Sequence, residues 1–269
     1  MNGILAGKTG IITGALDENS IAWKVAVKAV EQGANIVLSN APVALRMGTI
    51  HSLAQQCGAP VFGADATSQE DLEKLFDDTL SFAGGQIDFV LHSIGMSPNV
   101  RKGRHYTNLN YDWYHKSLDI SALSFHRMLQ VAYQKDAIKE WGSIVGLSYI
   151  AAQRTFPDYG DMADAKAVLE SIARGFGYHY GKKNKVRVNT ISQSPTKTTA
   201  GSGVGGFDAF FDYAEKMSPL GNASAEDCAN YCISLFSDFT RMVTMQNLFH
   251  DGGFSSTGIS TDMMGKFAY

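Results

Sequence analysis

Short apolar runs alternate with longer amphipathic segments along the whole chain. The apolar runs are rich in valine, isoleucine and leucine without strict polar alternation, which is typical of strands covered on both faces. They predict strands at 9–13, 35–39, 60–64, 88–93, 143–148, 186–192 and 247–250. Apolar residues at helical spacing predict helices near 20–32, 44–56, 69–82, 110–135, 161–181 and 224–236. Ser224 precedes two acidic residues and is placed to cap the last of these helices.

This alternation predicts an α/β fold: a single-domain, Rossmann-like, doubly wound parallel sheet of about seven strands with helices on both faces. We find no Pro/Gly/Ser-rich linker and no internal repeat, so we expect one domain over residues 1–269. The glycine-rich stretch 198–207 follows the sixth strand. Ligands bind beyond the carboxyl ends of the strands in such sheets. This stretch is therefore a candidate lid, with an ordinary surface loop as the alternative.

Composition and charge narrow the classes of function. The chain is 45% hydrophobic, with 27 glycines and only 6 prolines, which is typical of a globular protein. Its net charge of -3 argues against nucleic acid as the main partner, because phosphate binding needs a basic surface. No apolar run approaches the roughly 18 residues of a membrane span, so we expect no membrane partner. The three cysteines and the scattered histidines have no metal-ligand spacing, which favours free thiols, no metal and a cytoplasmic location.

The first strand ends at Thr13-Gly14, and a helix opens at Ser20 after a polar loop. A helix N-terminus with small residues presents unpaired N–H groups and a positive dipole end to a pyrophosphate. Gly14 supplies the turn of the dinucleotide fingerprint, but Ser20 and Ala22 stand where further glycines would be expected. Taken alone, this motif predicts dinucleotide binding only weakly.

Polar or small residues also follow the other predicted strands. Asp65 follows the third strand, where its carboxylate can accept a hydrogen bond from an adenine amino group. The small residues at 93–95 follow the fourth strand and would let the backbone approach an adenosine and its ribose. Tyr149 ends the fifth strand, and the segment 194–200 follows the sixth. Such residues at the carboxyl ends of five strands predict a cofactor site.

Tyr159 precedes Lys166 by seven positions in an alanine-rich helical sequence. Residues seven apart complete nearly two helical turns, so both can point the same way, about 10 Å apart along the axis. A tyrosine and a lysine on one face of a surface helix are usually only solvated. The spacing by itself therefore does not assign a function to the pair.

With these motifs the chain resembles the bacterial enoyl-[acyl-carrier-protein] reductases, a divergent branch of the short-chain dehydrogenases/reductases. The likeness runs from about Gly7 to Phe254. It is carried by Gly14 five residues before "SIA", by "HSIG", by "LSY" ten residues ahead of Tyr159, by the six residues between Tyr159 and Lys166, and by the closing "FHDGGF". The commoner short-chain enzymes have three residues between Tyr and Lys, and we expect the longer gap to be the only candidate here.

The resemblance implies reduction of a trans-2-enoyl thioester on acyl carrier protein, in the last step of the type II fatty-acid elongation cycle. Hydride would pass from NADH to the β-carbon, and negative charge would develop on the thioester oxygen. Tyr159 is the implied donor to that oxygen, because a phenol of pKa about 10 is a neutral donor at pH 7. Lys166 would bind the ribose hydroxyls of the nicotinamide. Tyr149 would line the pocket as a second phenol, and its role is left open.

The same resemblance implies which other residues make contacts. The cofactor-binding residues would be Gly14, Ala15, Ser20, Ile21, Asp65, Ala66, Ser93, Ile94, Gly95, Lys166, Thr196, Lys197, Thr198, Thr199 and Ala200. The substrate-binding residues would be Ser97, Tyr149, Tyr159 and Phe207. A mobile helix and lid would span about 198–215, with Phe207 and Phe210 on the acyl-chain side. A role for these two rings as ordinary core aromatics is the alternative.

Two departures bear on the cofactor. The end of the second strand offers neither a carboxylate for a ribose 2′-hydroxyl nor an immediate basic residue for a 2′-phosphate. The absence of a basic residue at Asn40-Ala41 favours NADH, while Arg46 keeps NADPH open. Ser194 stands before Pro195 where the family often has glycine, which would change how this loop lies on the nicotinamide.

Two rival functions remain. A short-chain carbonyl reductase or alcohol dehydrogenase would share the fold, but the Tyr–Lys gap and Tyr149 in place of a serine weaken that reading. A non-catalytic nucleotide-sensing protein would have little need of Tyr149, Tyr159 and Lys166 together. The partner of the favoured function is an acidic acyl carrier protein, for which we expect a basic rim that includes Lys197. The family resemblance also suggests a homotetramer.

Overall fold

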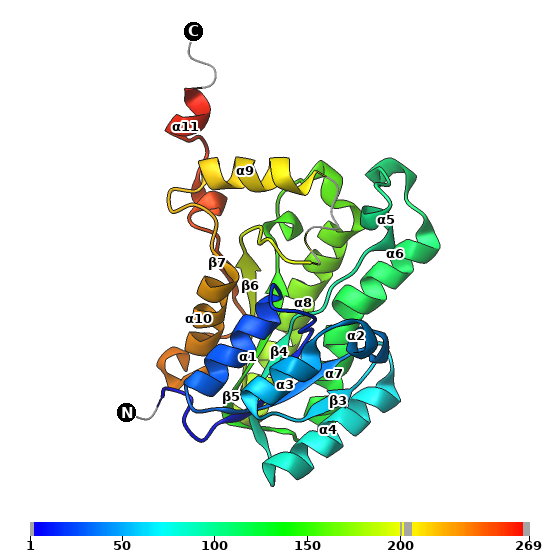
Figure 1. Cartoon of the computed structure of the whole chain (residues 1–269), viewed down its shortest axis with the longest axis vertical. Helices are drawn as coiled ribbons and strands as arrows, with labels where there is room; N and C mark the ends of the chain where they lie inside the picture. Colours follow the sequence, from blue (N-terminus) through cyan, green and yellow to red (C-terminus); the bar gives the residue numbers. More distant parts are fainter. Residues whose placement is uncertain (1–2, 200, 202–205, 266–269) are drawn as a thin grey trace.

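The computed structural model describes residues 3–199, 201 and 206–265. Its centre is a parallel seven-stranded sheet with the strand order β3-β2-β1-β4-β5-β6-β7 (Figure 1). The strands are β1 (Thr9–Thr13), β2 (Asn35–Asn40), β3 (Val61–Gly63), β4 (Ile87–His92), β5 (Ile138–Ser148), β6 (Arg187–Gln193) and β7 (Asn247–His250). The predicted doubly wound parallel sheet is therefore confirmed.

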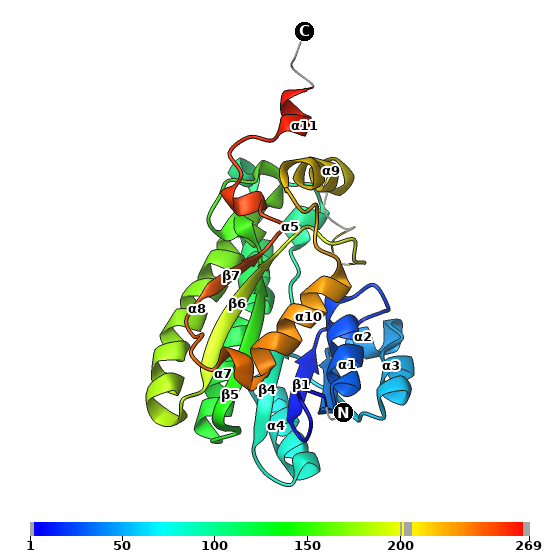
Figure 2. The same cartoon turned by 90° about the vertical axis from the view of Figure 1, so that its left-hand side faces the viewer.

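Helices cover both faces of the sheet (Figure 2). The helices α1 (Ile21–Glu31), α3 (Ile50–Cys57) and α10 (Ala225–Phe236) share one apolar core with the sheet, in which Phe89 stacks on Phe236. The helices α4 (Gln69–Ala83), α7 (Ser124–Gln134) and α8 (Gly160–Asn184) form the second core on the opposite face. Every residue of β1 and β6 is buried as a result. The polar side chains of β6 are paired inside the protein, as where Arg187 donates to Leu235 O at 2.9 Å.

The remaining elements lie mostly around the carboxyl ends of the strands. They are α2 (Pro42–Met47), α5 (Pro98–Arg101), α6 (Tyr111–Leu118), a π-helical stretch η2 (Asp119–Leu123), α9 (Phe207–Met217), α11 (Thr261–Met264) and the 3₁₀ turns η1 (Tyr106–Asn108), η3 (Ile150–Ala152), η4 (Pro157–Tyr159), η6 (Asp238–Thr240) and η7 (Phe254–Ser256). In Figure 1, α9 crosses the upper end of the molecule, and α11 extends beyond it.

Local sequence explains where the well-formed helices begin and end. Ser68 accepts a hydrogen bond from Asp71 N at the start of α4, and the helix ends at Gly84 in the left-handed conformation. At α10, Ser224 and Asp227 form a reciprocal capping box, so the predicted cap is confirmed. These contacts satisfy backbone N–H groups that the helices themselves cannot pair.

Two predicted elements differ from the structure. The single helix expected at 44–56 is two helices, α2 and α3, because the chain is extended at Gly48 and packs closely against the carbonyl oxygen of Leu16. The fifth strand begins at Ile138, five residues earlier than expected. An irregular pairing between β4 and β5, with Trp141 at φ 63, hides this early part from a simple apolar pattern.

Candidate active site

A cavity of about 260 Å³ lies at the carboxyl ends of β1, β4, β5 and β6. The strand order reverses between β1 and β4, and doubly wound sheets bind ligands at such a switch point. Of the predicted site residues, the cavity is lined by Gly14, Ser20, Ile21, Ser93, Ile94, Gly95, Ser97, Tyr149, Tyr159, Lys166, Thr196, Thr198 and Phe207. The fold thus brings together residues that are up to 193 positions apart in the sequence.

The turn after β1 needs glycine at position 14. Gly14 has φ 91, and a side chain there would overlap the carbonyl oxygen of Ser93, so the ends of β1 and β4 meet backbone to backbone. Ser20 accepts hydrogen bonds from Leu16 N at 3.0 Å and Asp17 N at 3.1 Å, which folds the loop around its hydroxyl. Ser20 makes no side-chain cap on α1, and the first turn of α1 holds no acidic residue. The first N–H groups of α1 are therefore open to an anion.

The loop after β4 has a glycine beside Lys166 and is anchored by hydrogen bonds to a neighbouring element. A Cβ on Gly95 would lie 3.4 Å from Met162 Cε and 3.7 Å from Lys166 Nζ, so a larger residue would crowd the lysine. Ser121, in the π-helical stretch η2, accepts from Met96 N at 3.0 Å and lies 3.1 Å from Met96 O. Such π-helical turns are frequent at functional sites. The irregular turn at η2 thus fixes the loop that forms one wall of the cavity.

Lys166 is a buried ammonium group at the end of β5. It is 7% exposed, and its Nζ donates to Leu147 O at 2.7 Å. Burial lowers the pKa of Lys166 to about 8, while the nearby Glu170 raises it. His92 lies deeper: burial and the charge of Lys166 lower the pKa of His92 to about 3, so it is neutral. Lys166 therefore supplies the positive charge of this part of the cavity at neutral pH.

Two phenols line the same cavity as the lysine. The rings of Tyr149 and Tyr159 lie 4.9 Å apart, and Phe210 packs edge-on against Tyr149. Tyr149 is 8% exposed, and its hydroxyl has no hydrogen-bond partner among the described residues. Burial raises the pKa of both phenols, and for Tyr149 the neighbouring Tyr159 and Asp251 raise it further. Both side chains are thus neutral hydrogen-bond donors at physiological pH.

Tyr159 lies just before α8, so it does not share a face of that helix with Lys166. Tyr159 ends the 3₁₀ turn η4, and α8 begins only at the next residue, Gly160. Gly160 has φ 49 and ψ -137, a conformation that favours glycine. This turn directs the chain so that Tyr159 still lines the cavity with Lys166.

A second tyrosine–lysine pair was overlooked in the sequence. Tyr178 and Lys182 have three residues between them, so the longer gap is not the only candidate spacing. Tyr178 is 55% exposed, and Lys182 Nζ lies over its ring at 5.9 Å in the last part of α8. Neither residue lines the cavity. The structure therefore separates a solvated pair from the pair at the cavity.

Of the other predicted cofactor residues, five do not line the cavity: Ala15, Asp65, Ala66, Lys197 and Thr199. Ala15 is buried in the first apolar core, and Asp65, beside Ala66, accepts hydrogen bonds from its neighbour Thr67. Lys197 Nζ lies 4.5 Å from the centre of the Phe211 ring, and Thr199 donates to Asp17 at 2.5 Å. Ala200 lies outside the described residues. The cofactor contacts of these six residues stay predictions.

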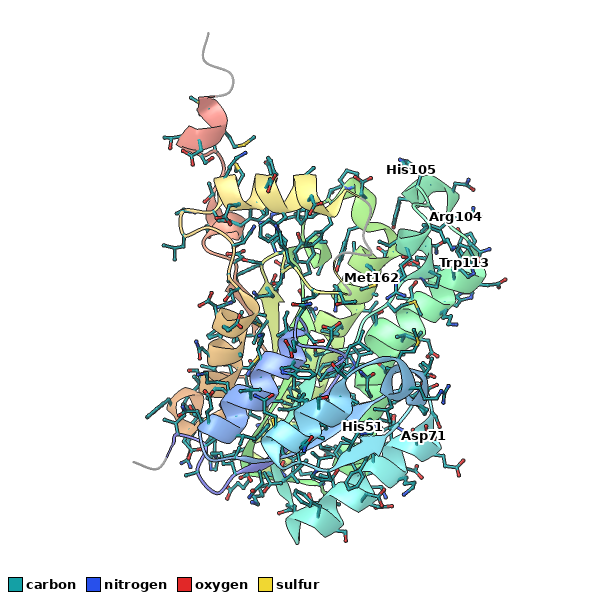
Figure 3. All side chains as sticks on the ribbon, in the orientation of Figure 1. His51, Asp71, Arg104, His105, Trp113 and Met162 are labelled. Carbon is teal, nitrogen blue, oxygen red and sulfur yellow. The ribbon has the colours of Figure 1, made fainter. Side chains whose placement is uncertain are left out.

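Several lining residues escaped the sequence analysis. Met162 lies three positions after Tyr159 and four before Lys166, so helical periodicity could have found it. Figure 3 shows Met162 inside the molecule below α9, with Arg104 and His105 at its outer edge. Met96, Val100 and Arg101 carry no such signal, because the segment after β4 has no regular period.

Two departures noted in the sequence have structural roles. Asn40 donates to Ala15 O and accepts from Ala41 N, both at 2.9 Å, so its side chain braces the loop after β1. The Ser194 hydroxyl accepts from Ala223 N at 3.0 Å and ties the loop after β6 to the start of α10.

Within the described ranges, no group of three or more His, Cys, Asp or Glu residues could hold a metal ion. No helix there is long and apolar enough to cross a membrane.

Comparison with known proteins agrees with this geometry. The family model described as enoyl-(acyl carrier protein) reductase matches residues 14–255. "Enoyl-[acyl-carrier-protein] reductase [NADH] 1" of Rhizobium meliloti is 34% identical over 261 residues, covering 96% of this chain and 94% of that protein. The FabI-NADH complex from Alistipes finegoldii is 64% identical with a TM-score of 0.97, covering 98% of this chain and 94% of that chain.

A more distant structure gives the same result. The NADH-dependent enoyl-[acyl-carrier-protein] reductase from Aquifex aeolicus is 30% identical with a TM-score of 0.88, covering 96% of this chain and 100% of that chain. The similarity therefore extends over the sheet, both helical layers and the cavity. With the family model matched over nearly the whole length, the chain belongs to the enoyl-(acyl carrier protein) reductase family.

Proposed function

We infer that this chain is an NADH-dependent enoyl-[acyl-carrier-protein] reductase, which reduces the trans-2 double bond of an enoyl thioester in fatty-acid synthesis. The observation that carries this inference is the cavity at the switch point, where two neutral phenols and one buried ammonium meet. NADH, when bound, supplies the hydride for the β-carbon of the substrate.

The residues around the cavity fit a dinucleotide. Gly14 lets the ends of β1 and β4 meet backbone to backbone, and Gly95 leaves space beside Lys166 that a side chain would fill. The first turn of α1 has no side-chain cap. We propose that Gly14, Ser20 and Ile21 hold the pyrophosphate through backbone N–H groups. Lys166 uses one of its three protons on Leu147 O and has two left for ribose hydroxyls.

The phenols would act on the developing negative charge. We propose that Tyr159 donates a hydrogen bond to the thioester oxygen as an enolate forms there. Tyr149 supplies a second donor to the same oxygen, and its buried, unpartnered hydroxyl supports this role. Met162 and Phe210 line the same space and exclude water, which strengthens both hydrogen bonds.

The charge around the cavity mouth suggests where the acyl carrier protein approaches. The cations Arg101, Lys102 and Arg104 are exposed on and just after α5, and none forms an ion pair in the described part of the chain. On the other side, α9 carries three acidic residues, Asp208, Asp212 and Glu215, against one cation, Lys216. An acidic carrier would meet attraction on the α5 side and repulsion on the α9 side. We propose the α5 side as the approach, with the predicted contact at Lys197 still to be tested.

Two further expectations concern larger parts of the molecule. The predicted lid at 198–215 includes most of α9, whose Phe207 and Phe210 line the cavity. We propose that α9 moves to admit the acyl chain.

The sheet ends at β7, where Phe249 is 42% exposed. An open edge with an exposed aromatic residue supports a subunit interface of the expected homotetramer, which light scattering of the purified protein would measure.

One assay tests the function. Purified protein is given a crotonyl thioester of acyl carrier protein with NADH and then NADPH, and loss of the reduced nucleotide is followed. We expect turnover with NADH and less with NADPH. Reduction of a ketone in place of the enoyl thioester would favour a carbonyl reductase, and binding of NADH without turnover of either would favour a nucleotide sensor.

A further inference from the structure

Asp161 is a fully buried carboxylate beside the proposed donor Tyr159. It is the second residue of α8 and lies two positions after Tyr159. Asp161 Oδ1 accepts from Ser97 Oγ at 2.5 Å, and Oδ2 accepts from Asn99 Nδ2 at 2.8 Å. Ser117 Oγ also lies 2.8 Å from Oδ2. Asp161 thus receives two neutral donors, and the single proton of Ser117 is shared between Asp161 and Trp113 O, which is also 2.8 Å away. Asp161 forms no ion pair with a described residue.

Burying a carboxylate in this way costs free energy of folding. A buried charge without an ion partner is disfavoured, and an apolar residue of similar size often stabilises a core more. The position of Asp161 in the first turn of α8, near the positive end of the helix dipole, offsets part of this cost. The hydrogen bonds offset more, but they also fix the carboxylate in one geometry. A group of this kind specifies position more than it adds stability.

The three side chains that contact Asp161 come from the segment between β4 and the end of α6, and of these Ser97 lines the cavity. Ser97 follows β4, lines the cavity, and accepts from Val100 N at 3.0 Å at the start of α5. Asn99 bonds both backbone groups of Asn110, at the start of α6, with 3.0 Å for each contact. Ser117 lies within α6. One carboxylate therefore joins the start of α8 to α5 and α6, which are 44 to 64 residues away in the sequence.

On its other side, Asp161 is linked to Tyr159 through a single glycine. Gly160 has φ 49, and a Cβ there would lie 3.3 Å from Val100 Cγ2, so the turn is also pressed against α5. With Asp161 held on one side and Val100 packed below, the backbone at Tyr159 has little freedom.

We propose that Asp161 is a positioning residue for the reduction, which holds Tyr159 against the cavity wall that Ser97 forms. This proposal rests on the proposed function, and the wild-type assay with an enoyl thioester tests that function separately. Asp161 does not touch the reacting atoms. It acts by fixing where Tyr159 leaves the 3₁₀ turn and where the loop after β4 ends.

The test compares Asp161→Asn with Asp164→Asn. The first variant keeps the shape but puts an amide N–H₂ group against a donor, so one hydrogen bond of the network is lost. Asp164 lies one turn further along α8, and its carboxylate accepts from the phenols of Tyr106 and Tyr114. Asp164 likewise joins α8 to residues of η1 and α6 through its carboxylate but has no contact with Ser97, and it is the matched control.

We expect Asp161→Asn to lower kcat per NADH-binding site by about tenfold or more, because small displacements of a catalytic group have effects of that size. The Kd for NADH should stay within about twofold, since Asp161 touches none of the proposed pyrophosphate contacts. The deuterium isotope effect on kcat, measured with deuterated NADH, should be at least as large as in the wild type, because the slowed step is the reduction itself. Asp164→Asn should leave all three quantities near their wild-type values.

Counting NADH-binding sites by titration separates this role from a loss of folded protein. A drop in bulk activity with an unchanged kcat per site would overturn the proposal and make Asp161 a stability group only. A smaller isotope effect would also overturn it, because another step would then be limiting. Should Asp161→Asn not fold, Asn99→Ala provides the same test, because Asn99 donates to Asp161 and does not line the cavity.

Discussion

The region that faces the cofactor and the region that faces the substrate are built by different means. Around the ends of β1 and β4, the cavity is shaped by Gly14, Gly95 and the open N-terminus of α1, so mainly backbone groups are presented. Around α5, α6 and the start of α8, it is shaped by side chains, with the Asp161 network behind and the ring of Phe210 in front. The shape of the first region depends on glycines, which have no side chain, and the shape of the second depends on specific side chains.

This difference separates what the fold gives from what the reaction needs. Backbone N–H groups at a helix start can hold the pyrophosphate of any dinucleotide, whatever the reaction. Donors for a developing charge must stand at one point, which takes side chains fixed by further side chains. Variants of the first region should therefore change NADH affinity, and variants of the second should change kcat.

Tyr159→Phe should have the largest effect of the variants we consider. Loss of a donor to a developing oxyanion lowers kcat by about a hundredfold or more, while the Kd for NADH should be unchanged. Steady-state kinetics and a fluorescence titration with NADH measure the two quantities. The matched control is Tyr178→Phe, which removes the hydroxyl of a solvated tyrosine on α8.

A wild-type kcat for Tyr159→Phe would show that the substrate region does not work as described. A loss of kcat in Tyr178→Phe would move the catalytic pair to Tyr178 and Lys182. If Tyr149→Phe were the more damaging change, the unpartnered hydroxyl of Tyr149 would be the main donor, and Tyr159 the second.

Gly14→Ala tests the cofactor region. A methyl group at this position meets the carbonyl oxygen of Ser93, and the backbone at φ 91 disfavours alanine. The Kd for NADH should rise by about tenfold or more, while kcat at saturating NADH stays close to wild type. Gly58→Ala is the control, because Gly58 also has a positive φ but has open space around it. Equal NADH affinities in both variants would contradict the close approach of the two strand ends.

Lys166 lies where the two regions meet, and its pKa of about 8 gives a pH dependence. The ammonium form donates to ribose hydroxyls, so the Kd for NADH should be constant below pH 8. Above it, Kd should rise by up to about tenfold per pH unit as the proton is lost. Stability without cofactor should respond in the opposite sense. The unfolded lysine keeps its proton up to about pH 10.4, so this group adds to the unfolding free energy as pH rises from 8.

Titrations at a series of pH values measure the NADH affinity, and thermal unfolding measures the stability. Lys166→Met should bind NADH weakly at every pH, and its Kd for NADH should not rise above pH 8. If the Kd for NADH still rises above pH 8 in Lys166→Met, another group is responsible for the titration.

The smallest expected effect concerns the approach of the carrier protein. Lys102→Glu and Arg104→Glu, at two exposed cations that do not line the cavity, should raise KM for the crotonyl carrier protein by about threefold to tenfold at low salt, with less effect at high salt. KM for a crotonyl pantetheine thioester should be unchanged, because this substrate has no protein surface. Lys182→Glu, an exposed cation far along α8, is the control. An equal increase in KM for both substrates would place the cations in the substrate site.

The sequence predicted much of the fold, because strand–helix alternation and apolar runs are local properties. The bounds of β1, β7 and α10 were predicted to within one residue. The helix break at Gly48 was missed, since its cause is a contact with Leu16 from another loop. The turn at Gly160 was missed for a similar reason: a glycine at the start of a helix does not reveal its φ, and Val100 packs against it from elsewhere in the chain.

By itself, the sequence determined the family, the parallel sheet and the strand ends at which polar residues gather. Only the tertiary structure showed that Tyr149 has a buried hydroxyl without a partner, that Tyr178 and Lys182 lie apart from the cavity, and that Asp161 joins α8 to Ser97. Local patterns follow from neighbours along the chain. Burial and hydrogen bonds across 64 residues depend instead on the crossings that bring distant strand ends to one edge of the sheet.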